Sequence, residues 1–185
     1  MRARTKTGLM LDEQETVDRF LAHHDEPSFS DLFKVISPRI FAYFRLHGRE
    51  REVAEDLTQE VMLTVYTQSR SLRNHELFRP WLFRIARNSW LQHVRRSSRQ
   101  VATSDLESTS EHLFSTREDP LQKVSMSQWM RWLGAEDREL VLLRYVEGLE
   151  YHEIAAVLNL PLGTVQWKIF QIRKRLAQRL GVHPA

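Results

Sequence analysis

The chain has 185 residues and no cysteine, and 42% of its residues are hydrophobic while 28% are charged. This composition allows one folded domain or two small ones, and the lack of cysteine excludes disulfides and thiolate metal sites. The formal net charge is +3 at pH 7, but the charged residues are distributed unevenly.

No apolar run reaches the length of a membrane span, and the basic N-terminal segment has no continuous apolar stretch after it. We therefore expect a cytoplasmic protein with no signal peptide and no membrane insertion. Residues 77–104 contain six arginines and residues 161–185 five lysines or arginines, and neither segment contains an acid. Two such blocks indicate two contacts with one polyanion, although the basic side chains could instead only solvate helix surfaces.

The first two predicted helices cover residues 12–24 and a longer stretch that begins near residue 28. Val17, Phe20 and Leu21 form the apolar side of the first helix. We expect Ser28 or Ser30 to cap the second helix, and Pro38 to kink or interrupt it.

The third predicted helix covers residues 52–69 and has two unlike faces. One face is apolar, and the other carries Glu55, Asp56, Gln59 and Glu60. Clustered carboxylates can be general acids or metal ligands, but no histidine lies at ligand spacing and no nucleophile motif is present. We therefore expect no enzyme activity, no catalytic residue, no metal and no cofactor, and a face that is solvated or docks on a basic partner.

Residues 70–79 predict a loop, and Pro80 opens a helix that runs to residue 96. Trp81, Phe83 and Trp90 alternate along this helix with arginines. Rings that stack on bases, mixed with guanidinium groups that hold phosphates, are typical of single-strand binding. The alternative is that these rings belong to the core of a helical bundle.

Residues 98–119 are rich in serine, threonine and acids, show no periodicity, and predict a flexible linker. Two amphipathic helices follow, over residues 121–133 and 135–147. The second should bury Leu140, Leu143 and Val146 and end at Gly148.

Residues 150–176 predict two helices joined by a tight turn. Asn159 tolerates the left-handed backbone that ends a helix, and Pro161 suits the first position of the next one. Each helix has an apolar stripe, formed by Ile154, Ala155 and Leu158 in the first and by Val165, Ile169, Ile172 and Leu176 in the second. Opposite the second stripe lie Trp167, Phe170, Gln171 and Lys174. A helix with one buried and one basic, amide-bearing side suits a DNA major groove, whereas the alternative is a helical hairpin with a solvated basic face.

These segments resemble a known family. Residues 53–66 (VAEDLTQEVMLTVY) and 78–96 (FRPWLFRIARNSWLQHVRR) resemble region 2 of bacterial sigma factors, and residues 137–176 resemble region 4. Region 4 follows region 2 directly through a short linker, and this organisation resembles that of the extracytoplasmic-function (ECF) group of RNA polymerase sigma factors. The resemblance implies an all-α fold of two small helical domains, a region 2 bundle and a four-helix region 4 module, joined by a linker. It divides the chain into an N-terminal lead-in (1–27), region 2 (28–97), the linker (98–119) and region 4 (120–185).

The resemblance also implies a function, which is promoter-specific initiation of transcription in a stress or environmental response. The implied partners are core RNA polymerase, through its β′ clamp helices and its β flap, promoter DNA and an anti-sigma factor. Recognition of the minus-35 element falls to Thr164, Gln166, Trp167, Lys168, Gln171, Lys174 and Arg175. Contact with the minus-10 element, with capture of a flipped base by the loop at residues 69–79, falls to Arg73, Asn74, Phe78, Trp81, Arg84, Arg87, Asn88 and Arg95. Docking on the polymerase falls to Asp56, Gln59 and Glu60.

Some positions depart from the family pattern. Glu150 stands where the first helix of the turn motif usually has a serine cap, and Glu153 is expected to favour its first turn. Gln166 could read adenine, while Trp167 and Phe170 could contact thymine methyls or form a protein interface. An ordinary helix–turn–helix regulator and a nuclease are the other classes considered. A regulator of that kind needs neither the acidic face nor the aromatic and arginine-rich helix, and a nuclease needs a metal or nucleophile cluster.

Overall fold

The computed structural model describes residues 8–47, 49–101, 130 and 132–180. The chain divides into two compact units, and each is described by itself. The first contains α1 to α4 and the second contains the elements from α6 onward, and no strand occurs over the described ranges. The predicted all-α, two-unit organisation is therefore confirmed. The predicted linker lies outside the described residues except at its start, where α4 continues to residue 101.

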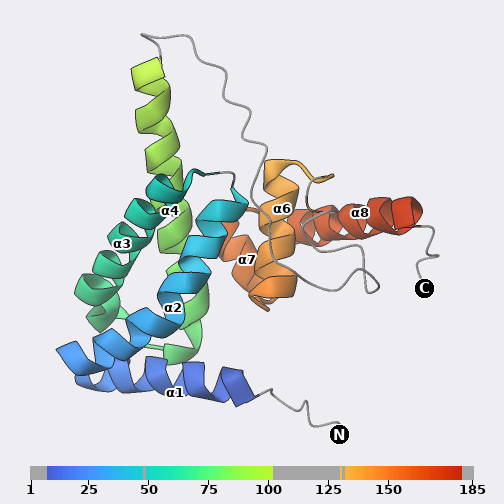
Figure 1. Ribbon diagram of the computed structural model, residues 1–185. Helices are drawn as coiled ribbons and strands as arrows, with labels where there is room; N and C mark the ends of the chain where they lie inside the picture. Colours follow the sequence, from blue (N-terminus) through green and yellow to red (C-terminus); the bar gives the residue numbers. More distant parts are fainter. Residues whose placement is uncertain (1–7, 48, 102–129, 131, 181–185) are drawn as a thin grey trace, which may run out of the picture. The chain divides into compact units, whose positions relative to one another are not determined.

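The first unit is a helical bundle with short connections (Figure 1). Its elements are α1 (Gly8–His23), α2 (Glu26–Leu46), α3 (Arg51–Gln68), the 3₁₀ turns η1 (Ser69–Ser71) and η2 (His75–Leu77), and α4 (Phe78–Val101). The apolar stripe of each helix faces inward, and its fully buried members include Phe20, Leu32, Ile36, Ile40, Tyr43, Phe44, Val61, Val65, Leu82 and Phe83. Burial of these stripes is what holds short helices together in water.

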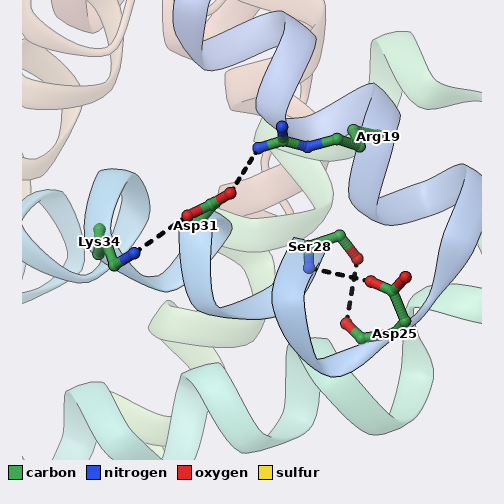
Figure 2. A network of polar contacts seen from close by, with 5 residues as sticks. All are labelled: Arg19, Asp25, Ser28, Asp31 and Lys34. Atoms are coloured by element: carbon green, nitrogen blue, oxygen red, sulfur yellow. Dashed lines mark hydrogen bonds and ion pairs between the residues drawn. The ribbon is translucent and has the colours of Figure 1, made fainter.

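The start of α2 differs from the prediction. Asp25 caps the helix, because its carboxylate accepts a hydrogen bond from the backbone nitrogen of Ser28 at 2.9 Å (Figure 2). The Ser28 hydroxyl donates to the carbonyl of Asp25 at 3.0 Å. Hydrogen bonding to Ser28 also lowers the pKa of Asp25 from its ordinary value. Ser28 is thus the partner of the cap, and Pro38 lies within α2 without ending it.

Helix α1 is joined to the rest of the unit by an ion-pair cluster. The Glu13 carboxylate is largely buried and pairs with Arg39 of α2 and with Arg79 of α4, the latter at 3.0 Å. In Figure 1, α1 crosses the end of the bundle at which α4 begins. The segment predicted as a lead-in therefore packs as part of the first unit, with Val17, Phe20 and Leu21 buried as predicted.

The second unit contains α6 (Ala135–Val141), a π-helical turn η3 (Leu142–Val146), α7 (Tyr151–Leu158) and α8 (Leu162–Leu180). The helix predicted over residues 135–147 therefore changes to π geometry at Leu142. Leu140 and Leu143 are buried as predicted, but Val146 is 40% exposed because the π turn shifts the helical register. Gly148 has a φ of 72°, so the backbone ends this element in a conformation that glycine adopts without strain.

The helix predicted over residues 121–133 lies mostly outside the described residues. Met130 and Leu133 are buried, whereas Trp132 is 42% exposed and has the Arg179 guanidinium 5.0 Å from its ring centroid. No helix in the described ranges is long and apolar enough to span a membrane.

We expect Glu13→Gln to destabilise the first unit by about 1.5–3 kcal/mol, because hydrogen bonds between charged groups contribute about that much. Denaturant unfolding followed by circular dichroism will measure the effect. Glu15→Gln, which removes an exposed carboxylate from the same helix, is the control and should have almost no effect. Equal stability of both variants would show that the cluster does not hold α1 in place.

Candidate nucleic-acid interface

The turn between α7 and α8 has the geometry that the sequence predicts. Asn159 adopts a left-handed backbone with φ 54° and ψ 48°, and the nitrogen of Leu160 donates to the Ala155 carbonyl at 3.0 Å. Pro161 lies one position earlier than predicted. It directly precedes α8, and its carbonyl accepts the first helical hydrogen bonds, from Thr164 at 2.9 Å and Val165 at 3.2 Å. These bonds fix the direction in which α8 leaves the turn.

The start of α7 is also held by side chains. The Glu150 nitrogen donates to Glu153 at 2.7 Å, which satisfies one of the free donors at the helix N-terminus. Arg144 of η3 donates to the Leu149 carbonyl at 2.8 Å and pairs with Glu150 at 3.0 Å. The residue that replaces the usual serine cap therefore connects α7 to the preceding turn.

Helix α8 has one buried and one exposed face, as predicted. Val165, Ile169 and Ile172 are at most 1% exposed. Trp167 and Phe170, on the other face, are each 61% exposed. Two large exposed rings beside polar groups make this face a candidate binding surface.

Two predicted DNA-binding cations of α8 form ion pairs within the unit. Lys168 pairs with Glu136 at 2.8 Å, and Arg175 pairs with Asp137 at 2.5 Å, both on α6. Each pair joins a basic side chain of α8 to a carboxylate of α6, so the pair as a whole carries no net charge. Thr164 and Gln171 are half-buried, whereas Gln166 and Lys174 are exposed beside the aromatic pair.

In the first unit, α4 supplies the aromatic and basic side chains. Phe78 is 2% exposed and its ring packs 5.9 Å from that of Trp81, so its predicted contact with a base is corrected to a core position. Phe83 is also core. Trp81 is half-buried and keeps part of its ring accessible, while Trp90 is covered by Arg49, whose guanidinium lies 4.0 Å from the ring centroid.

The polar face of α4 remains accessible. Arg84, Asn88 and Arg95 are exposed and follow one another at helical spacings that place them on one side, with the half-buried Arg87 beside them. In the preceding loop, Arg73 and Asn74 are exposed, and the Asn74 side chain accepts a hydrogen bond from the Glu76 nitrogen at 3.0 Å. This bond makes Asn74 the cap of η2.

The acidic face of α3 is exposed as predicted. Asp56, Gln59 and Glu60 all project to solvent. Beside them lies an apolar hollow of about 320 Å³ between α2 and α3, lined by Glu26, Phe29, Phe33, Gln59, Met62, Leu63 and Tyr66. A second hollow of about 310 Å³ adjoins the first and shares Phe33 and Gln59 with it, and the two hollows together are called the groove below.

This apolar groove was not predicted from the sequence. Leu63 is 64% exposed and Tyr66 is 43% exposed. They continue the helical spacing of Asp56, Gln59 and Glu60, so they extend the same face. Apolar residues that continue an acidic face, away from the buried stripe, were the signal that could have located the groove.

His93 lies between the basic residues of α4 and the acidic face of α3. Burial is the main cause that lowers the pKa of His93, and the charges of Arg49 and Arg96 lower it further while Glu60 opposes them. The lowered pKa favours the neutral imidazole at pH 7. Over the described ranges, no group of three or more histidine or carboxylate side chains is placed to hold a metal ion.

Comparisons with known proteins point to one family. The Sigma-70 region 2 family model matches residues 32–100 and the Sigma-70 region 4 model matches residues 132–176, together more than half of the chain. The chain is 32% identical over 167 residues to the ECF RNA polymerase sigma factor SigE of Mycolicibacterium smegmatis, covering 85% of this chain but 63% of that protein. It is 25% identical over 154 residues to the ECF RNA polymerase sigma factor SigM of Bacillus subtilis, covering 80% of this chain and 93% of that protein.

A solved structure has a similar fold. It contains the sigma factor RpoE of Bartonella quintana in a co-crystal with the anti-sigma factor NepR. The TM-score is 0.66 at 23% identity, and the match covers 84% of this chain and 98% of that one.

We expect Asn159→Ala to destabilise the second unit by about 1 kcal/mol, because alanine has the same Cβ in the left-handed region but lacks the short polar side chain that helps asparagine to adopt it. Asn159→Gly should be tolerated, since glycine adopts that backbone freely. Thermal unfolding of the full chain will compare the two variants with the parent. Equal losses from alanine and glycine would mean that the side chain of Asn159, and not its backbone, stabilises the turn.

Proposed function

The chain belongs to the sigma-70 family, in its extracytoplasmic-function group, and we propose that it initiates transcription through one DNA contact in each of its two units. The first unit, region 2, holds the opened minus-10 element and docks on core RNA polymerase. The second unit, region 4, reads the minus-35 element as a duplex. It acts by binding and without catalysis, in the cytoplasm, where RNA polymerase works.

The observation that carries this proposal is that one small unit has two oppositely charged faces. Helix α4 presents Arg84, Asn88 and Arg95, whereas α3 presents Asp56 and Glu60. A regulator that acts through its helix–turn–helix alone has no use for either face. A subunit that must hold a nucleic acid and a basic protein surface at once needs both.

The exposed face of α8 supports duplex recognition in the second unit. Gln166 is exposed and can pair with an adenine edge, and Trp167 and Phe170 offer apolar contact to thymine methyl groups. Lys174 is exposed on the same helix and suits a phosphate. Lys168 and Arg175 would contact DNA only if the DNA displaces their carboxylate partners on α6.

The loop before α4 and the polar face of α4 support single-strand recognition in the first unit. Arg73 and Asn74 are exposed in the loop, and the half-buried Trp81 follows at the start of the helix. Opening a base pair costs about 1.4 kcal/mol per stacking step, while stacking a flipped base on an aromatic ring returns about 1–3 kcal/mol. Opening several base pairs therefore costs more than the capture of one base returns, so promoter opening also requires the contacts of region 4 and of the polymerase.

We assign docking on the β′ clamp helices of the polymerase to the acidic face of α3 and the adjoining groove. The groove is apolar and the exposed acids lie along its edge, a combination that suits a helix with an apolar stripe and basic flanks. A contact of region 4 with the β flap is part of the same proposal. An anti-sigma factor, such as the one bound to the Bartonella relative, could cover the groove or the aromatic face of α8.

The first test concerns region 4. We expect Lys174→Ala to weaken binding to all promoters and to reduce the slope of log affinity against log salt by about 1, as for a lost phosphate contact. Gln166→Ala should instead lower discrimination at one base pair of the minus-35 element, by about 1–3 kcal/mol. Titration of the polymerase-bound protein onto promoters that differ at single minus-35 positions will measure both effects. A uniform loss from both variants would contradict this division between backbone and base contacts.

The second test concerns docking. We expect Glu60→Lys to weaken binding to core polymerase at least about tenfold, because a like-charge contact costs several kcal/mol. The matched control is Glu15→Lys, which makes the same charge change on α1. Surface plasmon resonance against core enzyme at two salt concentrations will compare them. Equal loss from both variants would mean that only the change in net charge weakens binding. No loss from either variant would show that α3 lies outside the interface.

A further inference from the structure

Helix α1 and His24, the residue directly after it, contact the loop between α3 and α4 at three points. These contacts involve the first residue of the loop, its middle and the residue that follows it into α4. We propose that α1 is a positioning helix that holds this loop in the conformation that captures a flipped base. The inference rests on the proposed function of the loop. Helix α1 precedes the segment that matches region 2, which begins at residue 32, so that match assigns it no role.

The strongest contact is at the end of the loop. Arg79 donates to Glu13 of α1 through Nε at 3.2 Å and Nη2 at 3.0 Å. The Glu13 side chain is 11% exposed and that of Arg79 is 26% exposed, so water screens this pair little. Arg79 also directly follows Phe78, a core residue, so the end of the loop is anchored both by charge and by packing.

The second contact is in the middle of the loop. His75 Nδ1 lies 3.3 Å from Asp18 Oδ1 of α1, and both side chains are about half exposed. His75 begins η2, directly after Asn74, which caps that turn. A contact at His75 therefore fixes the turn that orients the exposed side chains of Arg73 and Asn74.

The third contact is at the start of the loop. The Ser69 hydroxyl lies 3.4 Å from Nδ1 of His24, and Ser69 is 1% exposed. His24 directly follows α1 in a left-handed conformation with φ 51°, and its ring packs edge-on against Phe20 at 5.3 Å. The ring is thus held in place by the core beneath it.

The physical benefit is preorganisation. Fixing the backbone of a single loop residue has a cost in conformational entropy that is comparable with the stacking energy that a captured base returns. A loop that α1 already holds loses less conformational entropy when it captures a base. The two histidine contacts are long and partly exposed, so each should add little to global stability. Their loss should change the loop without unfolding the unit.

The first experiment measures the loop without DNA. Hydrogen exchange of the loop amides will be compared in the full-length parent, Asp18→Ala and His24→Gly, the latter chosen because glycine keeps the left-handed backbone. We expect exchange to be about two- to fivefold faster across residues 69–79 in both variants, the change expected from losing a contact of this strength. The matched control is Asp31→Ala, which removes a carboxylate that pairs with Arg19 of α1 at 2.7 Å and with Lys34 at 3.0 Å (Figure 2), neither of which is a loop residue. Unchanged exchange in the two test variants, or an equal change in the control, overturns the inference.

The second experiment measures the functional consequence. Transcription by core polymerase with each variant will be scored on promoters randomised in the minus-10 element. We expect Asp18→Ala and His24→Gly to reduce preference at the captured base about two- to fivefold, with preference in the minus-35 element and the melting temperature unchanged. Asn74→Ala, a change in the loop itself, tests the proposed function separately. If Asn74→Ala alters the minus-10 preference and the α1 variants do not, the positioning role of α1 is wrong. If Asn74→Ala has no effect either, base capture by the loop is wrong and the inference fails with it.

Discussion

The burial of one stripe on each functional helix is the constraint on which both surfaces of this protein depend. In α8, Val165, Ile169 and Ile172 have almost no exposed surface, which leaves Trp167 and Phe170 on the opposite face. In α3, burial of Leu57, Val61 and Val65 leaves Asp56, Gln59 and Glu60 exposed. Each helix has a fixed angular relation between its core side and its binding side, so the packing of the core sets the direction of every contact made outside.

Acidic and basic side chains of the first unit are also separated, each kind on its own helix. Acidic side chains gather on α3 and basic ones on α4, although the two helices pack against each other in one unit. The pKa of His93, which interacts with Glu60, Arg49 and Arg96, is lowered, and this favours the neutral imidazole. In the second unit, Lys168 and Arg175 of α8 pair with carboxylates of α6, whereas Trp167, Phe170 and Lys174 are exposed on α8.

Local features were predictable from the sequence, while long-range pairings were not. The left-handed Asn159, the buried stripe of α8 and the exposed acids of α3 follow from spacing and residue type, and the structure confirms them. Phe78 was predicted as a base contact because its segment resembles the minus-10 region of the family, and only the packed bundle shows that it fills the core. The partners of Lys168 and Arg175 lie more than 30 residues away, and no periodicity reveals such a pair. For the same reason, the contacts of α1 with the loop before α4, at separations of 45 to 66 residues, could not be predicted.

We propose that the chain has two weak DNA contacts, which become useful when a larger assembly supports both. The most direct test of this proposal is to measure specific promoter affinity and run-off transcription for the purified chain, with and without bacterial core polymerase. We expect a defined transcript and tight promoter binding only when core polymerase is present. Tight, sequence-specific binding by the chain alone, or the absence of any transcript with core polymerase across a promoter library, would contradict it.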